Sequence, residues 1–267
     1  MGYKIGFIGA GVMGGALARA VRKSEQSILL SNVPDIKAKE LAMEINCDFG
    51  DNKTVAEKCE YIVLAVKPQV IRSVLNDIAP VLKKRADKFT LISIAAGVPI
   101  ETLKQETGLD FPAIRLMPNT PVLVGKGVIL CVFDNVSAES KKEFYRMFSA
   151  AGFCDEINET EIDAAGALTG CGPAFCYIVM NSLAGGAAAC GIEPEKAVKY
   201  AEMTVLGAAQ LAISSGEDLE KLKEAVCSPK GTTIEGVEVL ENRNVRAALS
   251  DAVNAAYKRS LELSKGK

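Results

Sequence analysis

The N-terminal run Tyr3-Lys4-Ile5-Gly6-Phe7-Ile8-Gly9-Ala10-Gly11-Val12-Met13-Gly14 is the most informative segment of this chain. Its first half is apolar, as in a buried strand, and its second half places three glycines where a helix-forming segment begins. Gly9 permits a tight turn, Gly11 lets the backbone approach a pyrophosphate, and Gly14 lets the helix pack closely on the strand. The run therefore predicts a dinucleotide-binding βαβ unit, with the anion at the helix N-terminus.

The segments that follow this run alternate between strand-like and helix-like patterns. Strands are expected at residues 28–31, 61–66, 90–94, 113–117, 127–132 and 154–157. Helices are expected at residues 13–23, 35–44, 69–82 and 138–150. Such alternation is typical of an α/β fold with a parallel, doubly wound sheet of the Rossmann type.

After about Glu159 the strand-like runs end and alanine-rich helical stretches begin. Pro194 suits the first turn of a helix, and Gly216 suits the position after a last turn. Helices are expected at residues 161–191, 193–215, 218–226, 233–241 and 245–264. The sequence thus predicts two domains, a dinucleotide-binding domain over residues 1–159 and an all-helical domain over residues 160–267.

The composition excludes several classes of function. The 267 residues include no histidine, and 31 Lys and Arg stand against 33 Asp and Glu, for a net charge of −2. Without histidine there is no Ser-His or Cys-His nucleophile pair, which excludes most hydrolase mechanisms. The commonest zinc ligand is missing too, so no metal site is expected. The balanced charge gives no electrostatic drive toward nucleic acid, and none is expected as a partner.

The eight cysteines and the N-terminus favour a cytoplasmic protein. The cysteines are scattered through a long chain and most lie in apolar runs, so buried, reduced thiols are expected. The chain also enters a strand-like run at once, without the pattern of a signal peptide. Between Asp163 and Glu193 no residue is charged, which is long enough for a membrane span. Because this stretch is rich in Gly and Ala and contains Pro173, a helix buried on all sides, at a subunit interface, is favoured and no membrane is expected.

Three strand ends are candidates for binding the rest of a dinucleotide, because open α/β sheets bind ligands beyond the carboxyl ends of their strands. Ser31 and Asn32 could donate to a ribose 2′-phosphate, and no carboxylate stands at this tip to repel one. This favours NADP, with NAD as the alternative. The tips 65–68 and 94–97, with Met117-Pro118-Asn119-Thr120-Pro121, are candidates for lining the nicotinamide. A surface lysine at position 67 and ordinary loop prolines are the alternative interpretation.

The turn Cys227-Ser228-Pro229-Lys230-Gly231-Thr232-Thr233-Ile234-Glu235 is the last candidate. It gathers backbone N–H groups and two hydroxyls where a helix begins, which is a good receptor for a small carboxylate. A plain turn between helices, with a threonine as the N-cap, is the alternative.

In their order and spacing these blocks resemble pyrroline-5-carboxylate reductase, over essentially the whole chain. The resemblance implies reduction of L-1-pyrroline-5-carboxylate to L-proline with NAD(P)H, the final step of proline biosynthesis. It also implies that the helical domain binds substrate and forms dimers, which often assemble into decamers. It rests on residues 5–14, Ala65–Pro68, Ala95–Val98, Met117–Pro121, Gly170–Phe175 and Ser228–Glu235.

The resemblance also implies which residues bind each ligand. The substrate carboxylate would meet the backbone amides of Lys230, Gly231, Thr232 and Thr233, with Glu159 lining the same site. The Thr233 hydroxyl would bond the ring nitrogen, which makes Thr233 the catalytic residue. The cofactor would contact Ile8, Gly9, Ala10, Gly11, Val12, Met13, Ser31, Asn52, Ala65, Val66, Lys67, Pro68, Ile94, Ala95 and Ala96.

Two residues depart from the family pattern, since Lys230 replaces a usual glycine and Cys171 a usual serine. If position 230 needs a positive φ, lysine is unfavourable there by about 1–2 kcal/mol, although its charge would attract the substrate. A β-hydroxyacid dehydrogenase is an alternative, but it would need a lysine shortly after Gly170, and none occurs before Lys196. A non-catalytic nucleotide-binding regulator is a second alternative, which the carboxylate-binding turn disfavours.

Overall fold

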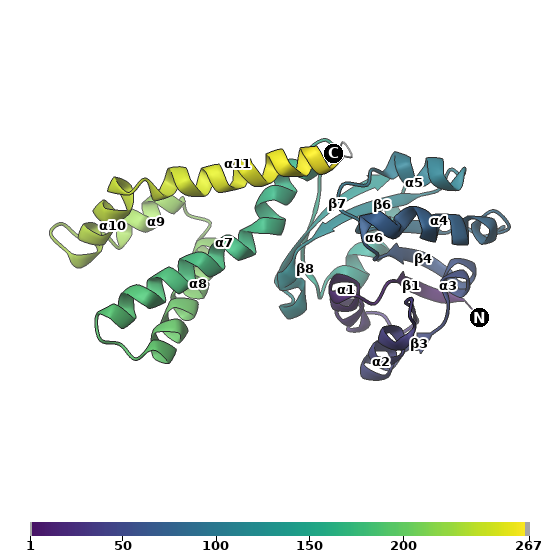
Figure 1. The fold of residues 1–267 in the computed structure, drawn as a ribbon, viewed down its shortest axis with the longest axis horizontal. Helices are drawn as coiled ribbons and strands as arrows, with labels where there is room; N and C mark the ends of the chain where they lie inside the picture. Colours follow the sequence, from purple (N-terminus) through teal and green to yellow (C-terminus); the bar gives the residue numbers. More distant parts are fainter. Residues whose placement is uncertain (1, 265–267) are drawn as a thin grey trace. The chain divides into compact units, whose positions relative to one another are not determined.

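The computed structural model describes residues 2–264 of the chain, which form two compact units (Figure 1). The first unit comprises the residues up to Gly170 together with those from Tyr257 on, and the second comprises Cys171–Ala256. Helices α7 (Ile162–Ala189) and α11 (Val245–Ser264) each contribute to both units. The domain boundary expected between residues 159 and 160 stays a prediction, because α7 is continuous where the two compact units divide.

The first unit is built on an eight-stranded sheet in the order β3-β2-β1-β4-β5-β6-β7-β8. From β3 to β6 all neighbouring strands are parallel. This confirms the doubly wound α/β sheet that the alternating pattern predicts. The strands are β1 (Tyr3–Ile8), β2 (Ile28–Ser31), β3 (Asp48–Phe49), β4 (Cys59–Leu64), β5 (Thr90–Ser93), β6 (Ala113–Pro118), β7 (Gly127–Asp134) and β8 (Gly152–Glu156).

The last two strands depart from an all-parallel sheet. Strand β7 pairs antiparallel with β6, whereas β8 pairs parallel with β7. Only the 3₁₀ helix η1 (Thr120–Val124) joins β6 to β7, and so short a connection cannot make the crossover that a parallel return needs. The longer helix α6 (Ala138–Phe148) joins β7 to β8, and the parallel pairing is restored.

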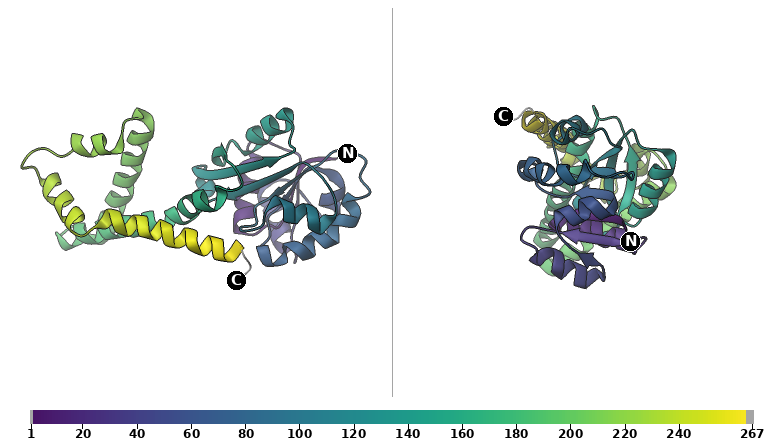
Figure 2. Two further views of the ribbon diagram at one scale, coloured as in Figure 1. Left: turned by 90° about the horizontal axis from the view of Figure 1, so that it is seen from above. Right: turned by 90° about the vertical axis from the view of Figure 1, so that its right-hand side faces the viewer.

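Helices cover both faces of this sheet (Figure 2). Phe7 and Leu17 belong to a core on the side of α1, α2 and α6, and Ile8 and Leu75 belong to a core on the side of α3, α4 and α5. Neighbouring residues of β1 thus enter opposite cores, as the two-residue period of a strand requires. The sequence analysis does not predict β3, α3, α5 or η1. The helices are α1 (Val12–Arg22), α2 (Ile36–Ile45), α3 (Asn52–Lys58), α4 (Pro68–Leu82) and α5 (Ile100–Thr107).

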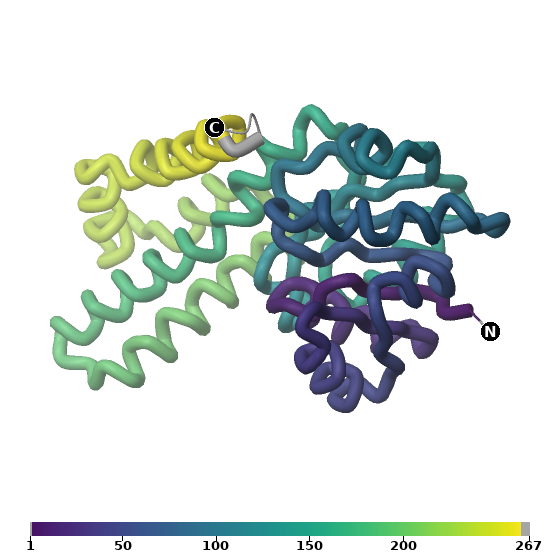
Figure 3. Tube along the Cα trace, turned by 45° about the vertical axis from the view of Figure 1, so that its right-hand side comes forward, coloured from purple at the N-terminus to yellow at the C-terminus, as the bar shows by residue number. Residues whose placement is uncertain are grey.

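The second unit consists of helices, as expected. Figure 3 shows α7 and α8 (Pro194–Ser215) side by side and antiparallel, and they pack through Ala184, Ala197 and Ala201. Helices α9 (Leu219–Ala225), α10 (Thr232–Asn242) and α11 follow. Large apolar side chains are exposed in the single chain, among them Ile178 at 66% and Leu211 at 58%. The expectation that α7 is buried on all sides is therefore wrong for one chain, because it lacks apolar partners along much of its length.

Helix α7 is also the one described helix that is long and apolar enough to cross a membrane. Only 17% of its most apolar window is buried within the chain. Among the described residues all eight cysteines are free, but only Cys59 and Cys131 are buried, so the expectation of buried thiols is wrong for the other six. Cys59 is fully buried, and burial raises the pKa of its thiol to about 12.

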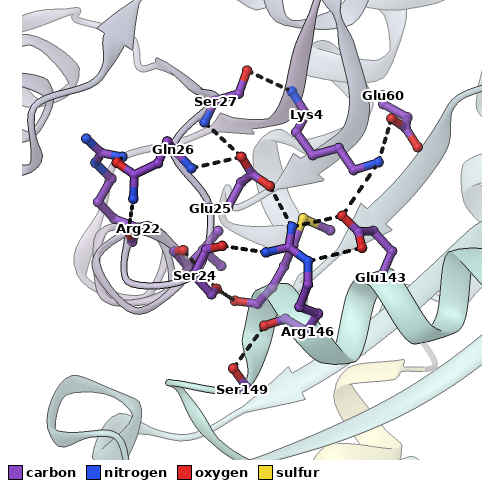
Figure 4. Close-up of polar contacts among 12 residues, drawn as sticks. Lys4, Arg22, Ser24, Glu25, Gln26, Ser27, Glu60, Glu143, Arg146 and Ser149 are labelled. Carbon is purple, nitrogen blue, oxygen red and sulfur yellow. Dashed lines mark hydrogen bonds and ion pairs between the residues drawn. The ribbon is translucent and has the colours of Figure 1, made fainter.

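A polar cluster ties α6 to the segment before β2 (Figure 4). Arg146 Nη2 lies 2.6 Å from Glu25 Oε2 and 2.8 Å from Glu143 Oε1. The Glu25 carboxylate also accepts hydrogen bonds from the amides of Gln26 and Ser27, at 2.8 and 2.9 Å. Burial by itself raises the pKa of Glu25, but these amides and Arg146 outweigh it, so the pKa lies below its usual value.

Candidate functional site

The glycine-rich loop joins β1 to α1 at the carboxyl end of β1. Gly9 has a φ of 111°, and a Cβ on it would lie 2.4 Å from the carbonyl oxygen of Ala65. A Cβ on Gly14 would lie 2.2 Å from the carbonyl oxygen of Gly9, whereas a Cβ on Gly11 would meet no described atom within 4 Å. Gly11 is the N-cap of α1, and within residues 2–264 no side chain caps this first turn. The open space and the uncapped amides fit a dinucleotide pyrophosphate.

A cavity of about 380 Å³ opens beside this loop. Three of the predicted cofactor segments line it, through Ile8 and Gly9, Asn52, and Val66. Helix α4 adds Asp77, which the sequence analysis does not single out. The structure thus brings these predicted segments together where the parallel strands β1 and β4 end, the edge at which open α/β sheets bind ligands.

The polar side chains at the end of β2 are bonded to the protein itself. Ser31 is 1% exposed and donates a hydrogen bond to Asn52 Oδ1 at 2.8 Å. Asn32 Oδ1 accepts from the amide of Ala10 at 3.0 Å, and Asn32 Nδ2 donates to the carbonyl of Pro34 at 2.7 Å. Asn32 therefore holds Ala10 of the glycine-rich loop, and Ser31 holds Asn52 at the start of α3. Sequence reasoning does not foresee these roles.

The tips of β4 and β5 reach the same edge of the sheet. The amide of Ala65 donates to the carbonyl of Ile8 at 2.8 Å, and the amide of Ile94 donates to that of Leu64 at 3.1 Å. Lys67 is exposed and is the N-cap of α4, with Pro68 at the first helical position. Ala96 is also exposed. These predicted tips therefore adjoin the glycine-rich loop and leave Lys67 and Ala96 accessible.

Sequence reasoning missed Arg115 on β6, whose side chain is 6% exposed. Its Nη1 lies 3.1 Å from Glu159 Oε1, and its Nη2 lies 3.9 Å from Asp163 Oδ1. The same Glu159 oxygen accepts from the amide of Ile100, at the start of α5, at 3.1 Å. The available signal is a charged residue inside the apolar run 113–117, because a buried arginine needs an ionic partner.

Asn119, in the predicted tip Met117–Pro121, is engaged with neighbouring elements. It is 7% exposed, its Nδ2 donates to the carbonyl of Thr169 at 2.8 Å, and its Oδ1 accepts from the amide of Val128 at 2.8 Å. The side chain therefore ties the end of β6 to α7 and β7.

In the second unit, α10 begins at Thr232 after a tight turn. Lys230 has a φ of 60°, so the condition under which lysine is unfavourable at this position is met. Gly231 is the N-cap, and no side chain of the described residues caps the turn. The alternative of a threonine N-cap is therefore wrong. The helix starts with uncapped amides and with an exposed Thr233.

Comparison with known proteins places these features in a family. Residues 4–97 match the family model described as NADP oxidoreductase, coenzyme F420-dependent. Residues 159–263 match the model of pyrroline-5-carboxylate reductase dimerisation. The pyrroline-5-carboxylate reductase of Methanosarcina acetivorans is 36% identical to this chain over 98% of each.

Solved structures agree with these matches. A pyrroline-5-carboxylate reductase from Coxiella burnetii has a TM-score of 0.90 and 30% identity, over 98% of this chain and 99% of that one. The pyrroline carboxylate reductase of Plasmodium falciparum, with NADP bound, has a TM-score of 0.86 and 31% identity, over 98% of each chain.

The likeness extends over both units, and this decides against the hydroxyacid dehydrogenase and the non-catalytic regulator. The dimerisation model covers residues 159–263, from the start of α7 to the end of α11, so the chain self-associates. The chain therefore belongs to the pyrroline-5-carboxylate reductase family, as an oxidoreductase that reduces pyrroline-5-carboxylate to proline with NAD(P)H.

Proposed function

We propose that the turn Lys230–Thr233 binds the imino acid and that Thr233 is the catalytic residue. The observation that carries this proposal is the uncapped start of α10, where Gly231 is the N-cap and Thr233 is exposed. Backbone amides at a helix N-terminus bind a carboxylate, and the helix dipole adds to the attraction. The amides of Lys230, Thr232 and Thr233 hold the carboxylate beside Gly231, whose own amide donates to the carbonyl of Ser228 at 2.9 Å. The Lys230 ammonium attracts the carboxylate over a longer range. Glu159, in the first unit, is proposed as a further substrate-binding residue.

In this mechanism Thr233 orients the substrate. The bound reduced nicotinamide supplies the hydride. A cyclic imine is basic enough to take its proton from solvent near neutral pH, so a chain without histidine needs no dedicated acid. The Thr233 hydroxyl bonds the ring nitrogen and fixes the angle at which the imine carbon accepts the hydride.

We propose NADPH as the preferred cofactor, with NADH as the alternative. Asp51 lies near the end of β2 and accepts hydrogen bonds from Thr54. Two further carboxylates there are paired with lysines, since Lys39 lies 2.6 Å from Asp35 and Lys53 lies 3.2 Å from Asp77. They therefore repel a 2′-phosphate only weakly. The residues proposed to bind the cofactor are Ile8, Gly9, Ala10, Gly11, Val12, Met13, Ser31, Asn52, Ala65, Val66, Lys67, Pro68, Ile94, Ala95 and Ala96.

The activity is tested by following NADPH oxidation with pyrroline-5-carboxylate, against a panel of hydroxyacids and keto acids. Oxidation is expected with the imino acid alone. Oxidation with a hydroxyacid or keto acid instead, or with no compound, would refute the assignment. Repeating the assay with NADH gives the ratio of kcat/KM for the two cofactors, and a ratio in favour of NADH would refute the proposed preference.

We also propose a dimer that assembles into decamers in the cytoplasm. The exposed apolar side chains of α7 and α8 support association, and the free cysteines suit a reducing compartment. Light scattering at micromolar concentration is expected to show the mass of ten chains. A stable folded monomer would contradict the association, and a stable dimer would contradict the decamer.

A further inference from the structure

We infer that Arg115 is a positioning residue for the reduction, which acts by holding the segment between β5 and α5 through Glu159. The inference rests on the proposed position of the nicotinamide at Ile94–Ala96. Arg115 itself is not proposed to touch either ligand. Its effect passes through the carboxylate of Glu159 to the amide of Ile100.

The side chain of Arg115 is buried, so its charge interacts with other protein groups and not with solvent. On β6, Arg115 lies two residues from Ala113 and two from Met117, so the three side chains share one face of the sheet. Ala113 belongs to the core under α3, α4 and α5, and Met117 packs against this core. A guanidinium with 6% exposure in this place is retained only with ionic partners.

The ionic partners of Arg115 connect β6 to the starts of α5 and α7 and to the end of α11. Glu159 Oε1 lies 3.1 Å from Arg115 Nη1 and accepts from the amide of Ile100 at 3.1 Å. Ile100 is the first residue of α5, so this amide is one of the donors that the helix itself leaves unsatisfied. Asp163 Oδ1 lies 3.9 Å from Arg115 Nη2 and accepts from Ser260 at 3.0 Å, which brings the start of α7 and the end of α11 into the cluster.

The segment after β5 is consequently anchored at both ends. At one end the amide of Ile94 bonds the carbonyl of Leu64 at 3.1 Å, within the sheet. At the other end Ile100 bonds Glu159, whose orientation depends on Arg115. Between them Gly97 has a φ of 72°, so the segment turns sharply near the proposed nicotinamide position. Loss of Arg115 would leave one of the two anchors in place.

Arg85 provides a matched control. Its side chain is 5% exposed, and its Nη2 lies 2.6 Å from Asp87 Oδ2. Its Nη1 donates to the carbonyls of Ala56 and Cys59, at 2.8 and 2.7 Å. Cys59 is the first residue of β4, so Arg85 acts at the amino end of that strand. Removing this equally buried charge costs stability without touching either anchor of the segment.

The experiment compares Arg115→Met, Arg115→Lys and Arg85→Met in the full-length assembled protein. We measure amide hydrogen exchange, the Kd for NADPH, and kcat. In Arg115→Met the Ile100 amide is expected to exchange faster, and kcat to fall about tenfold or more, since a misplacement of about 1 Å can cost about 100-fold. The Kd should change little, because most proposed cofactor contacts lie elsewhere. Arg115→Lys should recover part of kcat, and Arg85→Met should match the wild type in Ile100 exchange and kcat.

Equal Ile100 exchange and equal kcat in Arg115→Met and Arg85→Met would overturn the inference. If Arg115→Met fails to fold, Arg115→Lys decides in the same way, because lysine keeps the charge but cannot reach both carboxylates. Ala96→Leu separately tests the nicotinamide position, by adding bulk at an exposed residue of the segment. Unchanged kcat and KM for NADPH in Ala96→Leu would refute that position, while the Ile100 exchange would still report whether Arg115 holds the segment.

Discussion

Helices α1 and α10 begin in almost the same way and in different surroundings. The N-cap of α1 is Gly11, with φ −72° and ψ −171°, and that of α10 is Gly231, with φ −81° and ψ 168°. Within the described part of the chain neither first turn is capped by a side chain. By contrast, Asp51 caps α3 and Ser137 caps α6. The two helix starts share the chemistry of an anion receptor.

They differ in how the protein holds them. The start of α1 is packed against the sheet, where a Cβ on Gly9 or Gly14 would collide with backbone, and Asn32 bonds the amide of Ala10. The start of α10 follows an exposed lysine with a φ of 60°. At the start of α1 the neighbouring backbone leaves no room for a Cβ on Gly9 or Gly14. Lys230 is exposed, and its positive φ costs about 1–2 kcal/mol.

The largest expected effect is at α10. Thr233→Ala is expected to lower kcat by about 100-fold, because the ring nitrogen loses the group that orients it. The Kd for NADPH should stay at the wild-type value. The matched control is Thr232→Ala, which removes the neighbouring hydroxyl and keeps the backbone amides, so its kcat should stay close to wild type. Steady-state kinetics and NADPH titration check both variants, and an unchanged kcat in Thr233→Ala would remove this residue from the mechanism.

At α1 the prediction is a loss of cofactor affinity. Gly11→Ala places a methyl group in the open space over the loop and hinders the pyrophosphate. Losing one hydrogen bond to a charged group, about 1.5 kcal/mol, raises the Kd for NADPH roughly tenfold. Its Tm should stay close to wild type, whereas Gly9→Ala should lower Tm because a Cβ would lie 2.4 Å from Ala65 O. Calorimetry and fluorescence titration measure both quantities, and equal affinity for Gly11→Ala and wild type would exclude this pyrophosphate position.

At the start of α10, the variant Lys230→Gly distinguishes the effect of the positive φ on stability from the effect of the lysine charge on substrate binding. Glycine adopts a φ of 60° freely, so the free energy of unfolding should rise by about 1 kcal/mol. Loss of the ammonium should raise the KM for pyrroline-5-carboxylate up to about fivefold, since exposed ion pairs contribute up to about 1 kcal/mol. The KM should rise with salt more steeply in the wild type than in the variant, where the helix dipole still attracts the carboxylate. A KM and salt dependence equal to wild type would show that Lys230 takes no part in binding.

The smallest effect concerns the cluster around Glu25, which belongs to neither helix start. Folding lowers the pKa of Glu25, so its stabilisation is full above the unfolded value of about 4.3 and is lost as pH falls through the lower folded value. Glu25→Gln should lower the free energy of unfolding by about 1 kcal/mol at pH 7. Denaturation at several pH values should show this gap closing below about pH 4. If the difference in free energy of unfolding between wild type and Glu25→Gln stayed constant with pH, the ionised Glu25 carboxylate would not be its cause. The kcat at pH 7 should not change.

Short-range patterns in the sequence predict much of the cofactor site. They do not predict the hydrogen bonds that hold its residues in place. Gly9 and Val66 follow apolar runs in the sequence, whereas Asn52 is expected only from the family resemblance, and all three line one cavity. Ser31 and Asn32 were recognised as polar residues at a strand end, but their bonding partners are Asn52 and Ala10. Which way such a side chain turns depends on segments that are distant in sequence, and no local pattern encodes it.

The sequence alone determined the order of the longer strands and helices and the glycine-rich turn before α1, because periodicity and backbone freedom depend on residues a few positions apart. It did not predict β3, α3, α5 or η1, nor Gly231 as the N-cap of α10. Tertiary structure decided the reversal of β7, where η1 is too short for a crossover. It also decided the partners of Arg115, since Glu159 and Ile100 reach this guanidinium only when β6, α5 and the start of α7 have packed together. A charged residue inside an apolar run indicates that its charge needs an ionic partner, but only the folded chain shows which residue that partner is.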